Sequence, residues 1–401
     1  VVRGNKKTKS QVIVREMRTK KGEPFNAKAA RLSMQRLYNL NFFEDVNLKI
    51  IPGKQPGGNV LEITVVEQRT GTFSIGGGYS ASDGVVGILN VGDKNFRGQG
   101  ESVNVHWEIG GRASTAGNYS FTYLKPWLDR KQTSFGFTVY NFTNQYTDYQ
   151  TDGSEISTYN RQYRGVDFTF GRPANEKTTH YITLKNRWDK YKEHVDGPID
   201  YLDPITWGPP PARQYGQSYI DDNFGLTRSI ILSRVFDTRD SNTSPTEGVR
   251  YTLSAEIAGF GGDFRFNKYT LDARRYWKVG KTQVVALRGI YGLGTGNIPY
   301  MQLFSVGGIE TLRGYRDDQF KGNKMYSSTL EYRFPVAKRV SAALFTDIGN
   351  AWGSNSFAYD TSIKIGYGLG IRLVTPFGPV RVDYGIGNQG GRLHFNFGGQ
   401  F

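Results

Sequence analysis

Cysteine is absent from this sequence of 401 residues, and histidine is scarce, with 4 copies. Without cysteine the chain has no disulfides, no thiolate nucleophile and no cysteine ligands for a metal. The histidines also lack metal-ligand spacing; they are His106, His180, His194 and His394. We therefore expect no metal and no other cofactor.

Long hydrophobic runs are absent too. No apolar run approaches the roughly 20 residues that a membrane-spanning helix needs, so we do not expect a helical membrane protein. No nucleophile elbow is found, and the Gly-rich stretch GYGLG at residues 366–370 is not followed by a helix, as a phosphate-binding loop would be. These observations argue against an enzyme.

Basic residues outnumber acidic ones, which gives a net charge of +15. Residues 1–70 hold 14 Lys and Arg against 6 Asp and Glu, an excess of 8 that leaves +7 for the much longer remainder. That remainder has no basic run and no nucleic-acid-binding motif. We therefore expect a basic first region beside anionic lipid, and no nucleic-acid partner.

Residues 1–70 predict a small α+β module. The stretches SQVIVREM (10–17) and NAKAARLSMQRLYNL (26–40) read as helices. The second opens at Asn26, a residue type suited to cap a helix. The spacing of apolar residues in this helix places four of them on one face: Ala27, Ala30, Met34 and Leu37. Two alternating strands follow, and VVRG at residues 1–4 is the stub of another strand.

From residue 71 to residue 401 the pattern has a period of two. In SIKIGYGLGIRLV, residues 362–374, apolar side chains fall on one face and Lys, Arg or Gly on the other. A soluble β-sandwich would also alternate. These strands, however, reach the roughly 9–11 residues of a tilted membrane-spanning strand, and aromatic residues gather near their ends. We count about 16 candidate strands and predict a mostly β fold, a 16-stranded antiparallel transmembrane β-barrel.

Short and long connections alternate, which distinguishes a periplasmic side from an outer side. The long ones are residues 144–160, 193–216 and 295–323. The last contains VGGIETLRGYRDDQF, whose Arg313 no hairpin turn requires. Alternation points Glu331 into the barrel, and Asp347 follows on the next strand. A loop folded into the lumen would hold Arg313 between these carboxylates; the alternative is that Arg313 is one of many lumenal arginines facing water.

Several motifs in order resemble the BamA-type outer-membrane assembly factor family. They are VGGIETLRGY, LEYRFP, FTDIGNAW, GLGIRLVTPFGPVRVDYG and the terminal FNFGGQF. The first region, from GNKKTKSQVIVREM to RLYNLNFFEDVNLKII, is similar to the last of that family's POTRA domains, the periplasmic modules that precede the barrel. The resemblance implies a POTRA domain over residues 1–70, the last of several, and an outer-membrane barrel over residues 71–401.

The resemblance also implies a role for the loop motif. In the family the motif arginine, here Arg313 followed by Gly314 and Tyr315, is tucked into the lumen against acidic residues that match Glu331 and Asp347. The motif reads Leu-Arg-Gly-Tyr where Val and Phe are also familiar, and no cysteine pair staples this loop. Without that staple, we expect Arg313 to hold more of the loop's order.

The first and last barrel strands meet at a seam that we expect to be weak. The seam residues are Gly76, Gly77 and Gly78 in the first strand and Gly398, Gly399 and Phe401 in the last. Glycine weakens a strand because it offers no side chain to pack. Unpaired backbone groups in hydrocarbon cost several kcal/mol each, so an arriving strand has a strong reason to pair there. The alternative is that these glycines only relieve crowding where the barrel curves tightly.

These features predict a protein that folds and inserts β-barrel proteins into the bacterial outer membrane by strand pairing at the seam, without ATP. Its expected partners are unfolded outer-membrane barrel clients, periplasmic accessory lipoproteins and outer-membrane lipid, with the POTRA domain in the periplasm. A TamA-like factor and a two-partner secretion translocator of the same superfamily remain alternatives. A passive porin is a third, although porins lack a POTRA domain and the Arg-Gly-aromatic loop.

Overall fold

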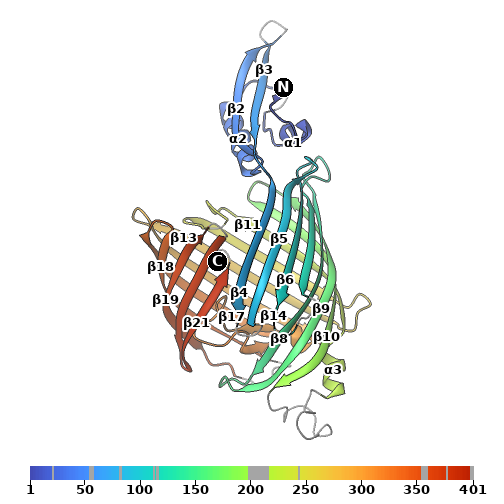
Figure 1. The fold of residues 1–401 in the computed structure, drawn as a ribbon, viewed down its shortest axis with the longest axis vertical. Helices are drawn as coiled ribbons and strands as arrows, with labels where there is room; N and C mark the ends of the chain where they lie inside the picture. The colour runs from blue at the N-terminus through green and yellow to red at the C-terminus, as the bar shows by residue number, and fades with distance from the viewer. Residues whose placement is uncertain are drawn as a thin grey trace.

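The computed structural model describes residues 1–19, 22–53, 58–80, 84–111, 113, 117–196, 216–242, 244–353, 360–375 and 378–397. Within these ranges a small α+β domain precedes a large β-barrel. Figure 1 shows the domain in blue above the barrel. No helix of the described ranges is long and apolar enough to cross a membrane.

The first domain is a three-stranded sheet with two helices. The strand order is β1-β3-β2, with β1 parallel and β2 antiparallel to β3. The elements are β1 Val2–Arg3, α1 Ser10–Val14, α2 Ala27–Asn39, β2 Phe43–Pro52 and β3 Asn59–Glu67. The predicted order of elements is confirmed, although α1 ends at Val14 and not at Met17.

Helix α2 begins directly after Asn26, the residue that the sequence predicts as its cap. The Asn26 side chain accepts a hydrogen bond from the backbone N–H of Ala29 at 3.0 Å. The buried residues are Ala30, Ser33 and Leu37, whereas Ala27 at the first helical position is exposed, so its assignment to the core face was wrong. Ser33 tolerates burial because its hydroxyl donates to the Ala29 carbonyl and accepts from the Arg18 N–H.

The second sheet has sixteen strands, which confirms the predicted fold class. Sequence neighbours pair antiparallel throughout, except that β17 follows β14 in the order. The strands are β4 Gly71–Ser80, β5 Gly84–Phe96, β6 Glu101–Gly110, β7 Asn118–Lys125, β8 Ser134–Tyr149, β9 Glu155–Pro173, β10 Thr178–Asp196, β11 Leu226–Asp237, β12 Gly248–Ala258, β13 Phe266–Val279, β14 Gln283–Gly296, β17 Lys324–Ala337, β18 Val340–Trp352, β19 Lys364–Thr375, β20 Gly378–Gly387 and β21 Gly390–Phe397. Figure 1 shows the sheet curled into a barrel.

The barrel wall is apolar outside and polar inside. On β19, Ile365 and Leu369 are 51% and 56% exposed on the outer face, whereas the lumenal Arg372 is 4% exposed. Large exposed apolar side chains recur on most strands of the barrel. Such a wall suits hydrocarbon outside and a polar interior, as in an outer-membrane barrel.

The long connections differ from the prediction at one place. Strands β8 and β9 pair as far as Tyr149 and Glu155, so the long loop predicted at residues 144–160 is wrong. Cross-strand contacts extend the ladder there: Thr147 bonds to Thr158 at 2.8 Å, and the Tyr146 and Tyr159 rings stack. Most of residues 193–216 lie outside the described ranges, and the short helix α3, Gln217–Asn223, follows them.

The small domain is fastened to the turns at one end of the barrel. The Asn95 side chain, 1% exposed, donates to the Thr8 hydroxyl at 2.8 Å, and the Trp127 indole donates to Glu16 at 3.0 Å. Gly98, in the turn between β5 and β6, accepts a hydrogen bond from the Lys9 backbone at 2.9 Å. The turns after β5 and β7 thus orient the domain.

Gly98→Ala is expected to loosen this junction, because a Cβ there would lie 2.8 Å from the Lys7 carbonyl carbon and against its oxygen. Gly22→Ala is the matched control, since both glycines have positive φ, of 70° and 87°, but nothing lies within 4 Å of a Cβ at Gly22. The shared left-handed backbone costs roughly 1–2 kcal/mol. Spin-label distances between domain and barrel should broaden only in Gly98→Ala; equal broadening in both variants would contradict the docking.

Candidate functional site in the barrel lumen

The segment between β14 and β17, residues 297–323, is here called the lumenal loop. It contains the 3-10 helix η2, Tyr300–Gln302, and a hairpin of β15, Phe304–Val306, with β16, Phe320–Gly322. Its buried apolar side chains pack against Met325 and Ala351 of the barrel wall; they are Phe304, Val306, Leu312, Tyr315 and Phe320. The loop therefore has a small core of its own on the wall of β17 and β18.

A turn at Gly307 and Gly308 determines the direction of the chain shortly before Arg313. Gly307 and Gly308 have φ of 136° and 81°, values that L side chains rarely adopt. The Thr311 hydroxyl accepts from the Gly307 N–H and donates to the Gly307 carbonyl, both at 2.9 Å. Ser327 of β17 donates to the Thr311 carbonyl at 2.7 Å. This turn reverses the chain directly before Arg313.

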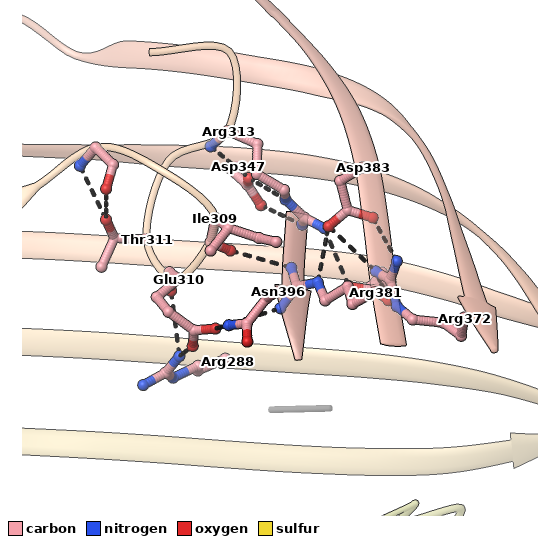
Figure 2. A network of polar contacts seen from close by, with 12 residues as sticks. Arg288, Ile309, Glu310, Thr311, Arg313, Asp347, Arg372, Arg381, Asp383 and Asn396 are labelled. Carbon is pink, nitrogen blue, oxygen red and sulfur yellow. Dashed lines mark hydrogen bonds and ion pairs between the residues drawn. The ribbon is translucent and has the colours of Figure 1, made fainter. Parts of the chain in front are cut away.

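Arg313 is bound mainly by Asp347 of β18. Its Nε and Nη2 donate to the two carboxylate oxygens, each at 2.7 Å, and its backbone N–H donates to the same carboxylate at 3.0 Å. Nη1 lies 3.4 Å from Glu331 of β17 and 3.0 Å from Asp383 of β20. Figure 2 shows the guanidinium between Asp347 and Asp383. Such paired charge-assisted bonds fix both position and orientation.

The guanidinium of Arg313 is shielded from water but remains charged. Arg313 is 1% exposed, as are Glu331 and Asp347, and its guanidinium carbon lies 3.3 Å from the centre of the Phe345 ring. Burial acts to lower the pKa of Arg313, but the hydrogen bonds that it donates to Asp347 and the neighbouring carboxylate charges raise it above its ordinary value overall. The alternative of an arginine facing open water does not describe this side chain.

Three further arginines surround the same carboxylates. Arg372 of β19 donates to Glu331 at 2.8 Å and also to Asp383, Arg333 donates to Glu331 at 3.1 Å, and Arg381 donates to Asp383 at 2.8 Å. Sequence reasoning did not select Asp383 or these arginines. Their signal was available, because alternation along β19 and β20 assigns Arg372, Arg381 and Asp383 to the lumenal face.

The tip of the lumenal loop, residues 313–315, packs against glycines of the barrel wall. A Cβ at Gly385 would lie 2.6 Å from the Gly314 nitrogen, and one at Gly387 would lie 2.7 Å from the Tyr315 ring. A Cβ at Gly366 would meet the Arg313 carbonyl oxygen. The glycines of β19 and β20 therefore let the loop backbone come into direct contact with the barrel wall.

The two residues after Arg313 extend the contact to later strands. Gly314 has a φ of 91° and donates its N–H to Nε2 of His394 on β21 at 3.1 Å. The Tyr315 hydroxyl donates to the Ile365 carbonyl of β19 at 3.2 Å. The predicted residues Arg313, Gly314, Tyr315, Glu331 and Asp347 thus meet at one place.

The predicted seam residues lie elsewhere. Gly76 is in β4, where nothing lies within 4 Å of an added Cβ, and Gly77 and Gly78 pair with Gly87 and Val86 of β5. The other three predicted seam residues fall outside the described ranges; they are Gly398, Gly399 and Phe401. Strands β4 and β21 end the strand order, and within the described ranges no backbone ladder joins them.

The described residues contain no group of three or more acidic or histidine side chains placed to hold a metal ion. The ion pairs and glycine contacts described above provide charge pairing and backbone contact between loop and wall.

Comparison with protein families gives two matches. Residues 95–401 match the Omp85 superfamily domain, and residues 1–68 match the POTRA family described as a surface antigen variable number repeat. The match to the larger domain covers most of the barrel and well over half of the chain. Outer-membrane placement with a periplasmic POTRA domain follows from these matches and from the relatives below.

Relatives and solved structures agree with these matches. The chain is 27% identical to the outer membrane protein assembly factor BamA of Nitratidesulfovibrio vulgaris, over 100% of this chain and 50% of that protein. It is 26% identical to the chloroplastic outer envelope protein 80 of Arabidopsis thaliana, over 98% of this chain and 54% of that protein. The chain thus spans about half the length of these curated relatives.

Two solved structures share the fold. The crystal structure of BamA from Haemophilus ducreyi lacking POTRA domains 1–3 aligns with a TM-score of 0.72 and 19% identity, covering 100% of this chain and 83% of that one. CdiB from Acinetobacter baumannii aligns with a TM-score of 0.68 and 14% identity, covering 98% and 72%. At these identities the likeness concerns the fold.

Arg313→Ala is expected to unseat the lumenal loop while leaving the barrel assembled, because removing one partner of a buried ion pair costs about 3–5 kcal/mol. Protease cleavage within residues 306–320 of the reconstituted barrel should become fast. Arg239→Ala is the control, since it removes another mostly buried arginine, paired with Asp237 at 2.8 Å outside this cluster. Unchanged protection of the loop in Arg313→Ala would refute the role of the ion pairs.

Gly385→Ala tests the glycine contact with every charged group left in place. The added methyl group collides with the Gly314 backbone, and such overpacking costs about 1–3 kcal/mol. Hydrogen exchange of the loop amides should accelerate. Gly289→Ala in β14 should have no such effect, because nothing lies within 4 Å of a Cβ there; equal exchange in the two variants would show that the close approach is unimportant.

Proposed function

Because the chain belongs to the Omp85 superfamily, we propose that it folds and inserts β-barrel proteins into the outer membrane. The observation that carries the proposal is the position of β4 and β21 at the two ends of the sixteen-strand order, with no ladder between them in the described ranges. Two strand edges then face each other across a seam, and an edge strand is a template for another chain.

The proposed mechanism is strand templating. An incoming client strand in hydrocarbon must pair its backbone groups, since each unpaired one costs several kcal/mol. Pairing first with an edge of the seam satisfies one row of these groups, and further client strands then add one at a time. Because hydrogen bonds are exchanged and not simply broken, the process needs no ATP and no catalytic residue.

The seam glycines and the lumenal loop have complementary roles in this proposal. Gly76, Gly77 and Gly78 weaken the β4 edge, because they contribute no side-chain packing to the ladder with β5. The lumenal loop, fixed by Arg313, keeps the wall of β17 to β21, which ends at the seam, in shape while the seam is used. Proposed partners are unfolded outer-membrane barrel proteins, outer-membrane lipid and periplasmic accessory lipoproteins.

A translocator of the two-partner type is the second candidate, because CdiB shares the fold. Passage of an unfolded chain through the lumen would require space beside β17 to β21. Here Arg313 and Tyr315 are each 1% exposed, and the loop that carries them is seated against that wall. The loop thus covers this part of the lumenal wall, which supports work at the seam. A TamA-like assembly factor would use the same seam.

The proposal is tested by locking the seam. Since the chain has 0 cysteines, pairs can be introduced with one cysteine on β4 and one on β21. In liposomes, oxidation should abolish the accelerated folding of an unfolded client barrel, and reduction should restore it. A matched pair across β12 and β13, at Leu253 and Leu271, is already in register and should leave the rate unchanged. Acceleration that persists with the seam locked would exclude strand templating.

A further inference from the structure

The tip of the lumenal loop is bonded to the last strand, β21. The Gly314 N–H donates to His394 Nε2 at 3.1 Å, and the Asn396 amide donates to the Glu310 carboxylate at 3.1 Å. Figure 2 shows Asn396 beside Glu310. His394 is 8% exposed, so the first of these bonds is shielded from water. The tip is thus tied to a strand that borders the seam.

The second half of the same loop, which leads back to β17, is bonded to strands β8 and β9 on the other side of the seam. Lys321 donates to Asp148 of β8 at 2.7 Å, and Arg316 lies 3.3 Å from Glu155 of β9. Asp148 is fully buried, and the Lys321 ammonium also lies 4.5 Å from the centre of the Tyr300 ring. Because the Lys321–Asp148 pair is shielded from water, its charge-assisted hydrogen bond is strong.

We propose that the lumenal loop is a strap that ties β21 to the β8–β9 hairpin across the seam, with His394 and Lys321 as positioning residues at its two ends. In strand order, only β4 to β7 and the seam itself lie between β21 and β8. A strap inside this arc limits how far β21 moves away when the seam opens. It thereby keeps the β21 edge in place for an incoming strand.

The strap acts only when both ends hold, because a loop fastened at one end moves with that wall. Loss of either end should therefore produce the same defect, and loss of both should add little. Two independent structural contacts would instead give defects that add. The effect of the strap on insertion rests on the function proposed above, whereas the tie between the two walls does not.

The test measures the distance between β8 and β21 in the reconstituted full chain. Spin labels on cysteines at Val139 and Leu393 report it, since both side chains point outward, at 42% and 71% exposure. His394→Ala should raise the population of longer distances about fivefold, the ratio expected for a hydrogen bond worth ~1 kcal/mol. Lys321→Met should raise it at least as much, because it removes one partner of a buried charge pair. The double variant should match the larger of the two single effects, and His394→Gln, which retains an acceptor, should keep the wild-type distribution.

Matched controls remove the same residue types elsewhere. His106→Ala removes a histidine of β6 bonded to Asn90 at 2.7 Å, and Lys185→Met removes a lysine of β10 paired with Glu256 at 3.0 Å. Neither should change the distance. Unchanged distances in His394→Ala or Lys321→Met, or additive changes in the double variant, would overturn the strap.

Client folding is measured on the same samples. A wild-type barrel that fails to accelerate folding would remove the proposed function, while the distance data still decide on the strap. If the wild type accelerates folding and the strap variants show longer distances, their folding rates should fall in proportion to the loss of the population that keeps the wild-type distance.

Discussion

A buried positive charge that must be matched inside the barrel determines how the lumenal face is built. Arg313 is removed from water, and a lone buried charge would be prohibitively costly. Asp347, Glu331 and Asp383 supply the opposite charge, but three carboxylates near one arginine would repel one another. Arg333, Arg372 and Arg381 separate them. The cluster around this one loop residue thus draws charged side chains from four successive strands, β17 to β20.

Arg313 also requires the loop backbone to lie close to the barrel wall. Its side chain reaches these carboxylates only if the loop backbone lies directly against the wall, and any Cβ at the contact would hold it away. This explains why the lumenal faces of β19 and β20 hold glycine as well as charge, as in Gly366 and Gly385 beside Arg372 and Asp383. Gly366, the first residue of the Gly-rich stretch GYGLG, lies directly beneath the loop backbone at Arg313.

The sequence predicted the strand number and the order of elements in the first domain, because period-two and helical patterns are local. Alternation also assigns Glu331 and Asp347 to the lumenal face, where the structure places them. It could not select Asp383 as a partner of Arg313, because which lumenal residues meet a loop depends on strand register and on the path of that loop. The hairpin of β8 and β9 was read as a loop because its polar residues conceal a ladder held by cross-strand pairs such as Thr147 with Thr158.

Stability is therefore distributed unevenly around the barrel. In the sixteen-stranded sheet, every strand between the two ends β4 and β21 has a ladder on both sides, and β17 to β20 are further joined by the buried charges beneath the loop. Strand β4 has one described ladder and three consecutive glycines, and β21 has one ladder plus its bonds to the loop. Local opening follows the elements with the fewest stabilising contacts. In the proposed mechanism an opening of this wall therefore begins between β4 and β21, and the contacts of His394 and Asn396 limit how far the β21 side moves.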